Sequence, residues 1–508
     1  MGLYDFTFYD LMERNAACFG GASAWFEADD ESVVTFSEYR EKSVRLARGL
    51  FEAGIRKGDR IGVLGENSFE FFLVYGAAAA LGTIVLPINW RLSAPEAVYN
   101  LSDCRPKALF ADEKFQDLVK GASESLSFIG AYVNLKSDQG DFQKISALMA
   151  GGEPGPLPEV SSDDGFVIIH TAAVAGRPRG ALLSHGNVMS ADLHLNDIFK
   201  FSHQDVHLNL LPLFHVGGLF MATQSFHAGA LNVNMSRFDA GKAAELIETH
   251  RASLMFEFPP ILSSILDESE KTGRDIGSLK SVMGLGAPGD IERYQEMTGG
   301  TFFCMYGQTE TSCLASAAPY SDRPGSAGRP IKLADITLVD DDDQPVAAGE
   351  TGEITMKGPM VFKGYWDLPD DTAHAFRGGR HHTGDLGRFD EDGFLWYAGR
   401  KPEKELIKPG GENVYPAEVE NAIMEHPDIE ETVVFGVPDP KWKEGIKAVC
   451  RLKDGRTLEP GDLIGFVGER IAGFKKPQYV EFVDDIPRAK DGSADREKVK
   501  ELYGGKQK

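Results

Sequence analysis

Apolar residues along the N-terminal part of this chain follow two alternating periods. Helical spacing, with apolar positions three or four residues apart, runs through 36–53, 68–80 and 94–101. Short apolar runs typical of strands lie between these stretches, at Arg60–Leu64 and Ala108–Phe110. This alternation predicts a layered α/β domain with largely parallel strands.

Two further patterns of expected secondary structure follow along the chain. The α/β pattern repeats over 185–300, where Val206–Leu211 and Ala252–Phe256 are expected to be strands. Over about 334–397 the strands become short and are interrupted by Gly and Asp, which indicates a small β-subdomain. A charged linker over 400–405 then precedes a compact unit with these expected elements: helices at 416–425 and 460–471, and strands at 432–437, 447–452 and 479–483.

The longest apolar run, Phe71–Ile88, has the length of a membrane span. Gly76, Gly82, Thr83 and Pro87 interrupt it. We therefore expect a buried, alanine-rich helix that runs into a strand, and no integral membrane segment.

Length and charge narrow the function classes. The 508 residues exceed what one core usually serves, so two or more domains are expected. Fifty-three basic against 77 acidic side chains give a net charge of −24, which repels nucleic acid and anionic lipid. An anionic substrate would have to be bound by local groups that attract negative charge, such as helix N-termini, backbone amides and a metal ion.

Cysteine usage and the N-terminus indicate a reducing compartment. The five cysteines have no paired short spacings, so neither a disulfide framework nor a zinc site is expected. The first residues lack a cationic region followed by an apolar stretch, so no signal peptide is expected. We predict a cytoplasmic protein.

Four motifs carry the candidate chemistry: Met305–Thr311, Thr383–Asp385, Gly399–Arg400 and Gly410–Pro416. An aromatic ring, a glycine, a hydroxyl and a carboxylate in close succession suit a nucleotide and its metal, although the first motif alone indicates only a strand end and a loop. In their order and spacing the motifs resemble those of the adenylate-forming acyl-CoA synthetases, a family that includes insect luciferases and peptide-synthetase adenylation domains. The resemblance covers nearly the whole chain.

The resemblance implies a two-step reaction. A carboxylate attacks the α-phosphorus of ATP and expels pyrophosphate, and a thiol then displaces AMP from the acyl adenylate. It also implies a large AMP-binding domain over 1–399, a hinge over 400–405, and a small mobile α+β lid domain over 406–508.

Nucleotide roles follow from the same resemblance. Tyr306 would lie on the adenine, Thr309 would contact the α-phosphate, and Glu310 would bind Mg²⁺. Asp385 would accept hydrogen bonds from both ribose hydroxyls, with Arg400 on the far side. The segment that borders the adenine and the acyl pocket corresponds to Gly286, Ala287 and Pro288.

The glycine-rich phosphate loop departs from the family pattern. The family has Thr-Ser-Gly-Thr-Thr-Gly here. This chain keeps the first and last residues, as Thr171 and Gly176, but has Ala-Ala-Val-Ala at 172–175 between them. The lost hydroxyls put pyrophosphate handling in question. Thr171, Gly176, the backbone amides and Arg179 remain as expected ATP contacts.

A second departure lies near the C-terminus, where the family's adenylation lysine is replaced by Ser493. Losing one preorganised donor at developing charge costs about 2.7 to 4 kcal/mol. Whether Lys490 or Lys498 replaces the missing lysine stays open.

The coenzyme A channel is expected at Gly410 and Gly411, because glycine lets the pantetheine arm pass close to the backbone.

Two assignments stay open between alternatives. The hinge residue is Lys404 if the linker is counted back from Gly410, and Pro402 if it is counted forward from Arg400. His215 either orients the substrate carboxylate or is a packed core histidine.

The expected walls of the acyl pocket, which suggest an apolar or cyclic acid, are Phe256, Phe258, Phe303, Ser312 and Cys313.

The sequence therefore predicts an acyl-CoA synthetase that uses ATP, Mg²⁺ and coenzyme A to activate a hydrophobic fatty, cyclic or aromatic carboxylic acid. Two alternatives remain: an impaired family member that binds a nucleotide or acyl adenylate, and a ligase that loads a carrier protein. Luciferase-like oxygenation is remote, and a homodimer stays open.

Overall fold

The computed structural model describes residues 3, 5–136, 140–150, 157–174, 177–401, 406–488 and 494–505. The chain divides into two compact units. Unit 1 comprises Met1–Trp90, Leu101–His170 and Gly180–Gly399, and unit 2 comprises Arg91–Asn100, Thr171–Arg179 and Arg400–Lys508.

A nine-stranded sheet in unit 1 has the order β16-β15-β14-β13-β12-β10-β11-β1-β2. Its central strands pair in parallel from β1 to β14, and β2, β15 and β16 pair antiparallel at the edges. The strands are β1 (Ser23–Glu27), β2 (Val33–Thr35), β10 (Val206–Asn209), β11 (Leu231–Asn234), β12 (Leu254–Glu257), β13 (Ser281–Gly284), β14 (Thr301–Tyr306), β15 (Ser316–Pro319) and β16 (Arg329–Pro330).

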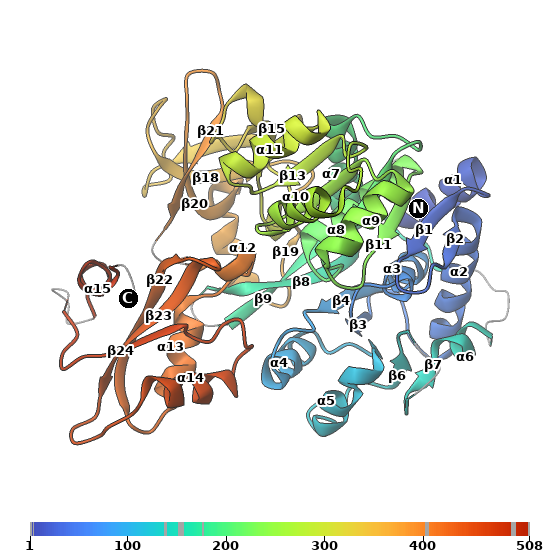
Figure 1. Cartoon of the computed structure of the whole chain (residues 1–508). Coiled ribbons are helices and arrows are strands. Elements are labelled where there is room, and N and C mark those ends of the chain that lie inside the picture. Colours follow the sequence, from blue (N-terminus) through green and yellow to red (C-terminus); the bar gives the residue numbers. More distant parts are fainter. Residues whose placement is uncertain are drawn as a thin grey trace. The chain divides into compact units, whose positions relative to one another are not determined.

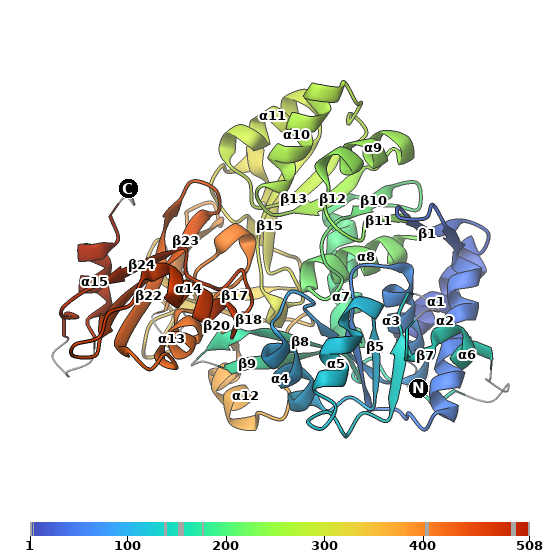
Figure 2. The ribbon, with the colours of Figure 1, turned by 60° about the horizontal axis from the view of Figure 1, so that its bottom comes forward.

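Helices cover both faces of this sheet, as expected where crossover connections join parallel strands. Figure 2 shows α9, α10 and α11 together along one face and α7 and α8 on the other. The helices are α7 (His185–Phe199), α8 (Val216–Ala228), α9 (Ala240–His250), α10 (Ile261–Thr272) and α11 (Pro288–Thr298).

A second, eight-stranded sheet has the order β19-β9-β8-β4-β3-β5-β6-β7 (Figure 1). Strands β3 to β6 pair in parallel, so the α/β prediction for the N-terminal part is confirmed. The strands are β3 (Arg60–Leu64), β4 (Ile84–Ile88), β5 (Ala108–Ala111), β6 (Ala131–Asn134), β7 (Gln143–Lys144), β8 (Gly165–Val174), β9 (Arg177–Ser184) and β19 (Gly364–Tyr365). The accompanying helices are α1 (Phe8–Phe19), α2 (Phe36–Glu52), α3 (Phe69–Leu81), α4 (Ala94–Cys104), α5 (Gln116–Gly121) and α6 (Ile145–Ala150).

The long apolar run forms a buried helix and a strand, as predicted. Ser68 caps α3 by accepting a hydrogen bond from the Phe71 N–H, and Gly82 ends the helix in the left-handed region at φ 70°. Every residue of α3 except Glu70 is buried, which explains why its sequence is apolar on all sides. Among the described residues, no helix is long and apolar enough to cross a membrane.

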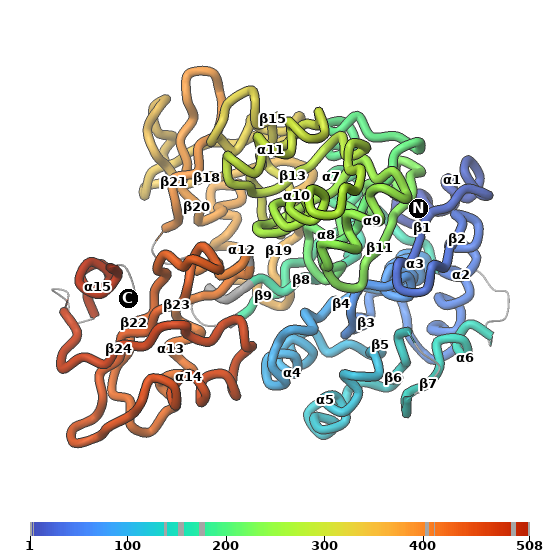
Figure 3. The backbone as a smooth tube through the Cα atoms, in the orientation of Figure 1, coloured from blue at the N-terminus to red at the C-terminus, as the bar shows by residue number. Residues whose placement is uncertain are grey.

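The predicted β-subdomain is a four-stranded sheet of order β17-β18-β20-β21. It contains β17 (Asp335–Val339), β18 (Gly352–Lys357), β20 (His381–Phe389) and β21 (Leu395–Arg400), and α12 (Pro369–Ala375) precedes β20. The backbone trace in Figure 3 shows β18 and β20 side by side, and they pair antiparallel. The motif Thr383–Asp385 lies inside β20.

The C-terminal part of unit 2 is a small α+β fold with the sheet order β22-β23-β24. The strand expected at 432–437 extends over Ile429–Asp439 because β23 pairs with it along this whole length. Alternate residues of β22 pack into two different hydrophobic clusters. Val434 packs with residues of α13 and α14, and Val433 packs with Val499 of α15. The elements are β22 (Ile429–Asp439), β23 (Lys443–Leu452), β24 (Tyr479–Phe482), α13 (Pro416–Met424), α14 (Pro460–Gly468) and α15 (Arg496–Tyr503).

Candidate functional site

The candidate site in unit 1 begins where β12, β13 and β14 end. Parallel strands place their carboxyl ends at one edge of a sheet, and here Glu257 pairs with Gly284, which pairs with Cys304. Gly284 has φ 153°, and a Cβ there would lie 2.0 Å from the Glu257 carbonyl oxygen. The chain then passes through Gly286 and Ala287 to Pro288, which opens α11.

The loop after Tyr306 folds tightly back on itself. A Cβ at Gly307 would lie 2.0 Å from the carbonyl oxygen of Cys313, so only glycine fits at this position. Thr309–Thr311 form one 3₁₀ turn, and Ser312 and Cys313 follow with φ 52° and 81°. This path leaves Thr309 9% and Glu310 5% exposed.

Glu310 is held by the segment that leads into β19. The Tyr365 hydroxyl donates to Oε1 of Glu310 at 2.9 Å. The Phe362 N–H donates to the Glu310 carbonyl oxygen at 3.0 Å. A buried carboxylate oriented in this way is a suitable hard ligand for a divalent cation.

Tyr306 and Asp385 are joined directly, although 79 residues separate them. The Tyr306 hydroxyl donates to Oδ2 of Asp385 at 2.7 Å. Burial, assisted by the negative charge of Asp385, raises the pKa of Tyr306 well above its ordinary value, so the phenol stays protonated and remains a donor. Two predicted nucleotide-binding residues are thus brought together.

Gln308 is a site residue that the sequence analysis missed. Its Nε2 donates to Oδ2 of Asp385 at 3.1 Å, and its Oε1 lies 3.1 Å from Nε2 of His381. Because the amide nitrogen donates to Asp385, the amide oxygen accepts, and Nε2 of His381 carries the proton. The only available signal was its place between Gly307 and Thr309 in the motif.

His215 caps helix α8, because its Nδ1 accepts a hydrogen bond from the Gly217 N–H at 3.1 Å. Its ring lies 6.3 Å from that of Phe258, and the Phe258 and Phe256 rings are 5.2 Å apart. These three aromatic side chains form a wall next to the strand ends. The capping contact gives His215 a structural task that is compatible with either of its predicted roles.

The other predicted wall residues are placed differently. The Phe303 ring packs edge-on against Phe199 of α7, with the two centroids 5.3 Å apart. Ser312 donates to the Met360 carbonyl oxygen at 2.6 Å. Cys313 is 3% exposed, and its burial raises the pKa of the thiol to about 12. A role for these residues as pocket walls stays a prediction.

Further predicted residues belong to unit 2. Thr171 Oγ1 donates to the Arg179 carbonyl oxygen at 3.3 Å, and Arg400 is the last residue of β21. Gly410 has φ 59°, and its N–H donates to the Trp442 carbonyl oxygen at 3.2 Å. Gly411 follows in the same 3₁₀ turn. Outside the described residues lie Gly176, Pro402, Lys404, Lys490 and Ser493, as do the side chains of 172–177.

Two groups of potential metal ligands occur among the described residues: Asp103 with Cys104 and His170, and Asp343 with Glu353 and His382. Glu310 belongs to neither group. In the second group, the Arg377 guanidinium already contacts both carboxylates.

Comparison with protein families matches residues 12–366 to the AMP-binding enzyme model and 418–493 to the AMP-binding enzyme C-terminal domain. The chain belongs to the AMP-binding enzyme family. Its fold, with a large N-terminal domain of mixed sheets and a small C-terminal α+β domain, matches solved structures of this family. The protein is therefore an enzyme of the AMP-forming acid–CoA ligase family, which implies ATP and coenzyme A as co-substrates.

Three similar proteins cover nearly the whole chain. An indoleacetate–CoA ligase of Aromatoleum aromaticum is 34% identical, over 94% of this chain and 94% of its own. A feruloyl-CoA synthase of Amycolatopsis sp is 33% identical, over 93% and 94%. A structure of o-succinylbenzoate CoA synthetase from Bacillus subtilis, bound with a product analogue, superimposes with a TM-score of 0.85 at 27% identity, over 97% and 98%.

Proposed function

We propose that this ligase activates a hydrophobic carboxylic acid that carries a ring, and transfers its acyl group to coenzyme A. The three similar proteins named above are each named for an acid with an aromatic ring. The aromatic wall of His215, Phe256 and Phe258 offers rings for edge-to-face and stacked contacts with such an acid.

The observation that carries the nucleotide placement is the contact between Tyr306 and Asp385. The bond holds the Asp385 carboxylate just beyond the hydroxyl end of the Tyr306 ring. An adenine on the ring and its attached ribose at the carboxylate would suit this arrangement. In this proposal Tyr306 lies on the adenine, Asp385 accepts from the ribose hydroxyls, and Gly286–Pro288 border the base. Arg400 assists at the ribose.

The first half-reaction is mostly a problem of positioning and charge. The carboxylate oxygen of the acid attacks the α-phosphorus, and the bond to the β-phosphate breaks to release pyrophosphate. Thr309 donates to the α-phosphate, while Thr171, Gly176 and Arg179 contribute donors to the leaving phosphates. Glu310 would hold Mg²⁺, and a bound Mg²⁺ would neutralise charge that develops on the phosphate oxygens.

In the second half-reaction the coenzyme A sulfur attacks the acyl carbon, the bond to AMP breaks, and the thiol proton is released. Gly410 and Gly411 would line the path of the pantetheine arm, because glycine allows close approach to the backbone. Lys404 would lie in the hinge on which the lid domain turns between the half-reactions.

An acid panel tests this proposal. Purified enzyme with ATP and Mg²⁺ is given arylacetic, cinnamic and straight-chain acids of matched carbon number, and labelled pyrophosphate exchange and acyl-CoA formation are measured. We expect the ring acids to give the highest kcat/KM, by up to about tenfold, because a favourable aromatic contact with the wall contributes about 0.5 to 1.5 kcal/mol.

Other outcomes separate the alternatives. A preference for straight chains would contradict the ring proposal. Adenylate formation without transfer to coenzyme A would favour a carrier protein as the acceptor. Nucleotide binding without pyrophosphate exchange would favour an impaired enzyme, as the altered loop at 172–175 and Ser493 suggest.

A further inference from the structure

The segment that carries Asp385 is a bulge in strand β20. Glu353 of β18 pairs with Leu386, and Thr355 pairs with His382, so one residue of β18 lies opposite three residues of β20. Those three are Thr383, Gly384 and Asp385. A bulge interrupts the ladder of backbone hydrogen bonds and redirects the side chains it contains.

Side chains replace the hydrogen bonds that the bulge removes. Thr383 Oγ1 donates to the Ile354 carbonyl oxygen at 2.6 Å and accepts from the Asp385 N–H at 3.2 Å. The Gly384 N–H donates to Oε1 of Glu353 at 2.9 Å. Gly384 has φ 67°, a conformation that glycine adopts without strain. The backbone next to Asp385 is therefore fixed by one carboxylate from the neighbouring strand.

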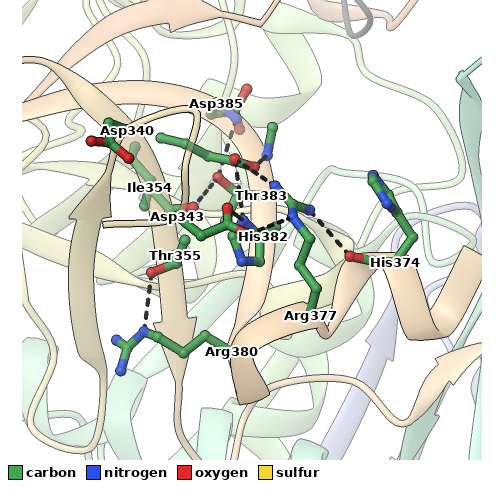
Figure 4. A network of polar contacts seen from close by, with 12 residues as sticks. Asp340, Asp343, Ile354, Thr355, His374, Arg377, Arg380, His382, Thr383 and Asp385 are labelled. Atoms are coloured by element: carbon green, nitrogen blue, oxygen red, sulfur yellow. Dashed lines mark hydrogen bonds and ion pairs between the residues drawn. The ribbon is translucent and has the colours of Figure 1, made fainter. Parts of the chain in front are cut away.

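Glu353 is itself held rigidly. Its side chain is 3% exposed, and its Oε2 accepts from Nη2 of Arg377 at 3.1 Å and from Nδ1 of His382 at 3.2 Å. The same guanidinium donates to Asp343 through Nε at 3.2 Å. Figure 4 shows Arg377, His382 and Asp343 converging beside Thr383. A buried carboxylate is stable only with such partners.

We propose that Glu353, held by Arg377 and His382, is a positioning residue that sets the Asp385 carboxylate for recognition of the ribose hydroxyls. The inference rests on the proposed function of Asp385. Tyr306 and Gln308 orient the carboxylate group of Asp385 from one side. Glu353 controls the direction in which the side chain leaves the backbone, because a rotation at Gly384 would swing the adjacent Asp385.

The charge and the two acceptors of Glu353 are both required. A glutamine in its place has one oxygen, which can satisfy the Gly384 N–H. Its NH₂ group would then face the Arg377 guanidinium, which has only donors and would repel it. Glu353→Gln keeps the size of the side chain while it removes the charge and one acceptor, so it tests both without opening a cavity.

The test compares the binding of AMP and 2′-deoxy-AMP by calorimetry. We expect the wild-type enzyme to prefer AMP, and Glu353→Gln to weaken AMP binding about tenfold while 2′-deoxy-AMP changes much less. In the Asp385→Ala background, the same substitution should cause no further loss. Arg377→Lys, which keeps the charge and loses the fork geometry, should shift the preference in the same direction and is the variant to use if Glu353→Gln does not fold.

Asp335→Asn is the matched control. It breaks the ion pair between Asp335 and Arg380 in the same sheet, whose N–O distances are 2.9 and 3.0 Å. Neither residue is part of the bulge. Its preference for AMP over 2′-deoxy-AMP should equal that of the wild type, with similar melting temperatures.

Two results would overturn the inference: unchanged affinities for both nucleotides in Glu353→Gln, or an equal loss of affinity for both, which indicates a merely structural role. Failure of the proposed nucleotide site looks different. In that case the wild type would not discriminate between the two nucleotides, and Asp385→Ala would bind AMP normally.

Discussion

Glu310→Ala is expected to lower the rate of pyrophosphate exchange by about a hundredfold to a thousandfold, the range for loss of one preorganised electrostatic group. Glu310 is 5% exposed and is oriented by the Tyr365 hydroxyl, so its carboxylate is fixed before a metal arrives. Its removal takes away the proposed Mg²⁺ ligand at the phosphates. Exchange is measured across a range of Mg²⁺ concentrations.

Tyr365→Phe is the control for this prediction. It removes the hydroxyl that contacts Oε1 of Glu310 and keeps the carboxylate. We expect a several-fold loss of rate and a loss of stability on the order of 1 kcal/mol, the net value of one hydrogen bond. Exchange by Glu310→Ala close to the wild-type rate would show that the metal is held elsewhere.

Asp385→Ala is expected to lower kcat/KM for ATP about a hundredfold or more, because two hydrogen bonds from the ribose to a charged acceptor are lost, at 1.5 to 3 kcal/mol each. The loss should appear mainly in KM for ATP and in the affinity for AMP. The Tyr306 hydroxyl and the Gln308 amide also lose their shared acceptor, so the melting temperature should fall. Steady-state kinetics and calorimetry measure these effects.

Tyr306→Phe separates the two roles assigned at this position. It keeps the ring that lies on the adenine and removes one donor to Asp385. We expect AMP affinity to fall less than tenfold, since one net hydrogen bond is worth about 0.5 to 1.5 kcal/mol. Normal ATP kinetics in Asp385→Ala would mean that the nucleotide has been placed wrongly.

Local patterns were sufficient for most of the fold. The apolar run Phe71–Ile88 correctly predicts a helix and a strand because burial on all sides, a capping serine and an interrupting glycine are all visible in neighbouring residues. Element ends were less accurate where pairing decides them. The strand expected at 432–437 extends over Ile429–Asp439. The helix expected over 460–471 ends at Gly468.

The positioning residues around Asp385 could not be predicted in the same way. Glu353 lies 31 residues before Gly384, and His381 lies 73 residues after Gln308. Each of these contacts depends on the register of β18 against β20 or on the fold of the loop after β14. No local spacing encodes either of them.

The sequence by itself determined the class of fold, the family, and the order of the residues Tyr306, Glu310 and Asp385, since these depend on local periodicity and on motifs within short segments. Only the tertiary structure decided that Thr383–Asp385 form a bulge, that Glu353 and Gln308 bond to it, and that His381 bonds in turn to Gln308. The physical reason is that a buried polar group takes whichever partner the folded chain brings within hydrogen-bonding distance, and that choice is made by strand register over long separations.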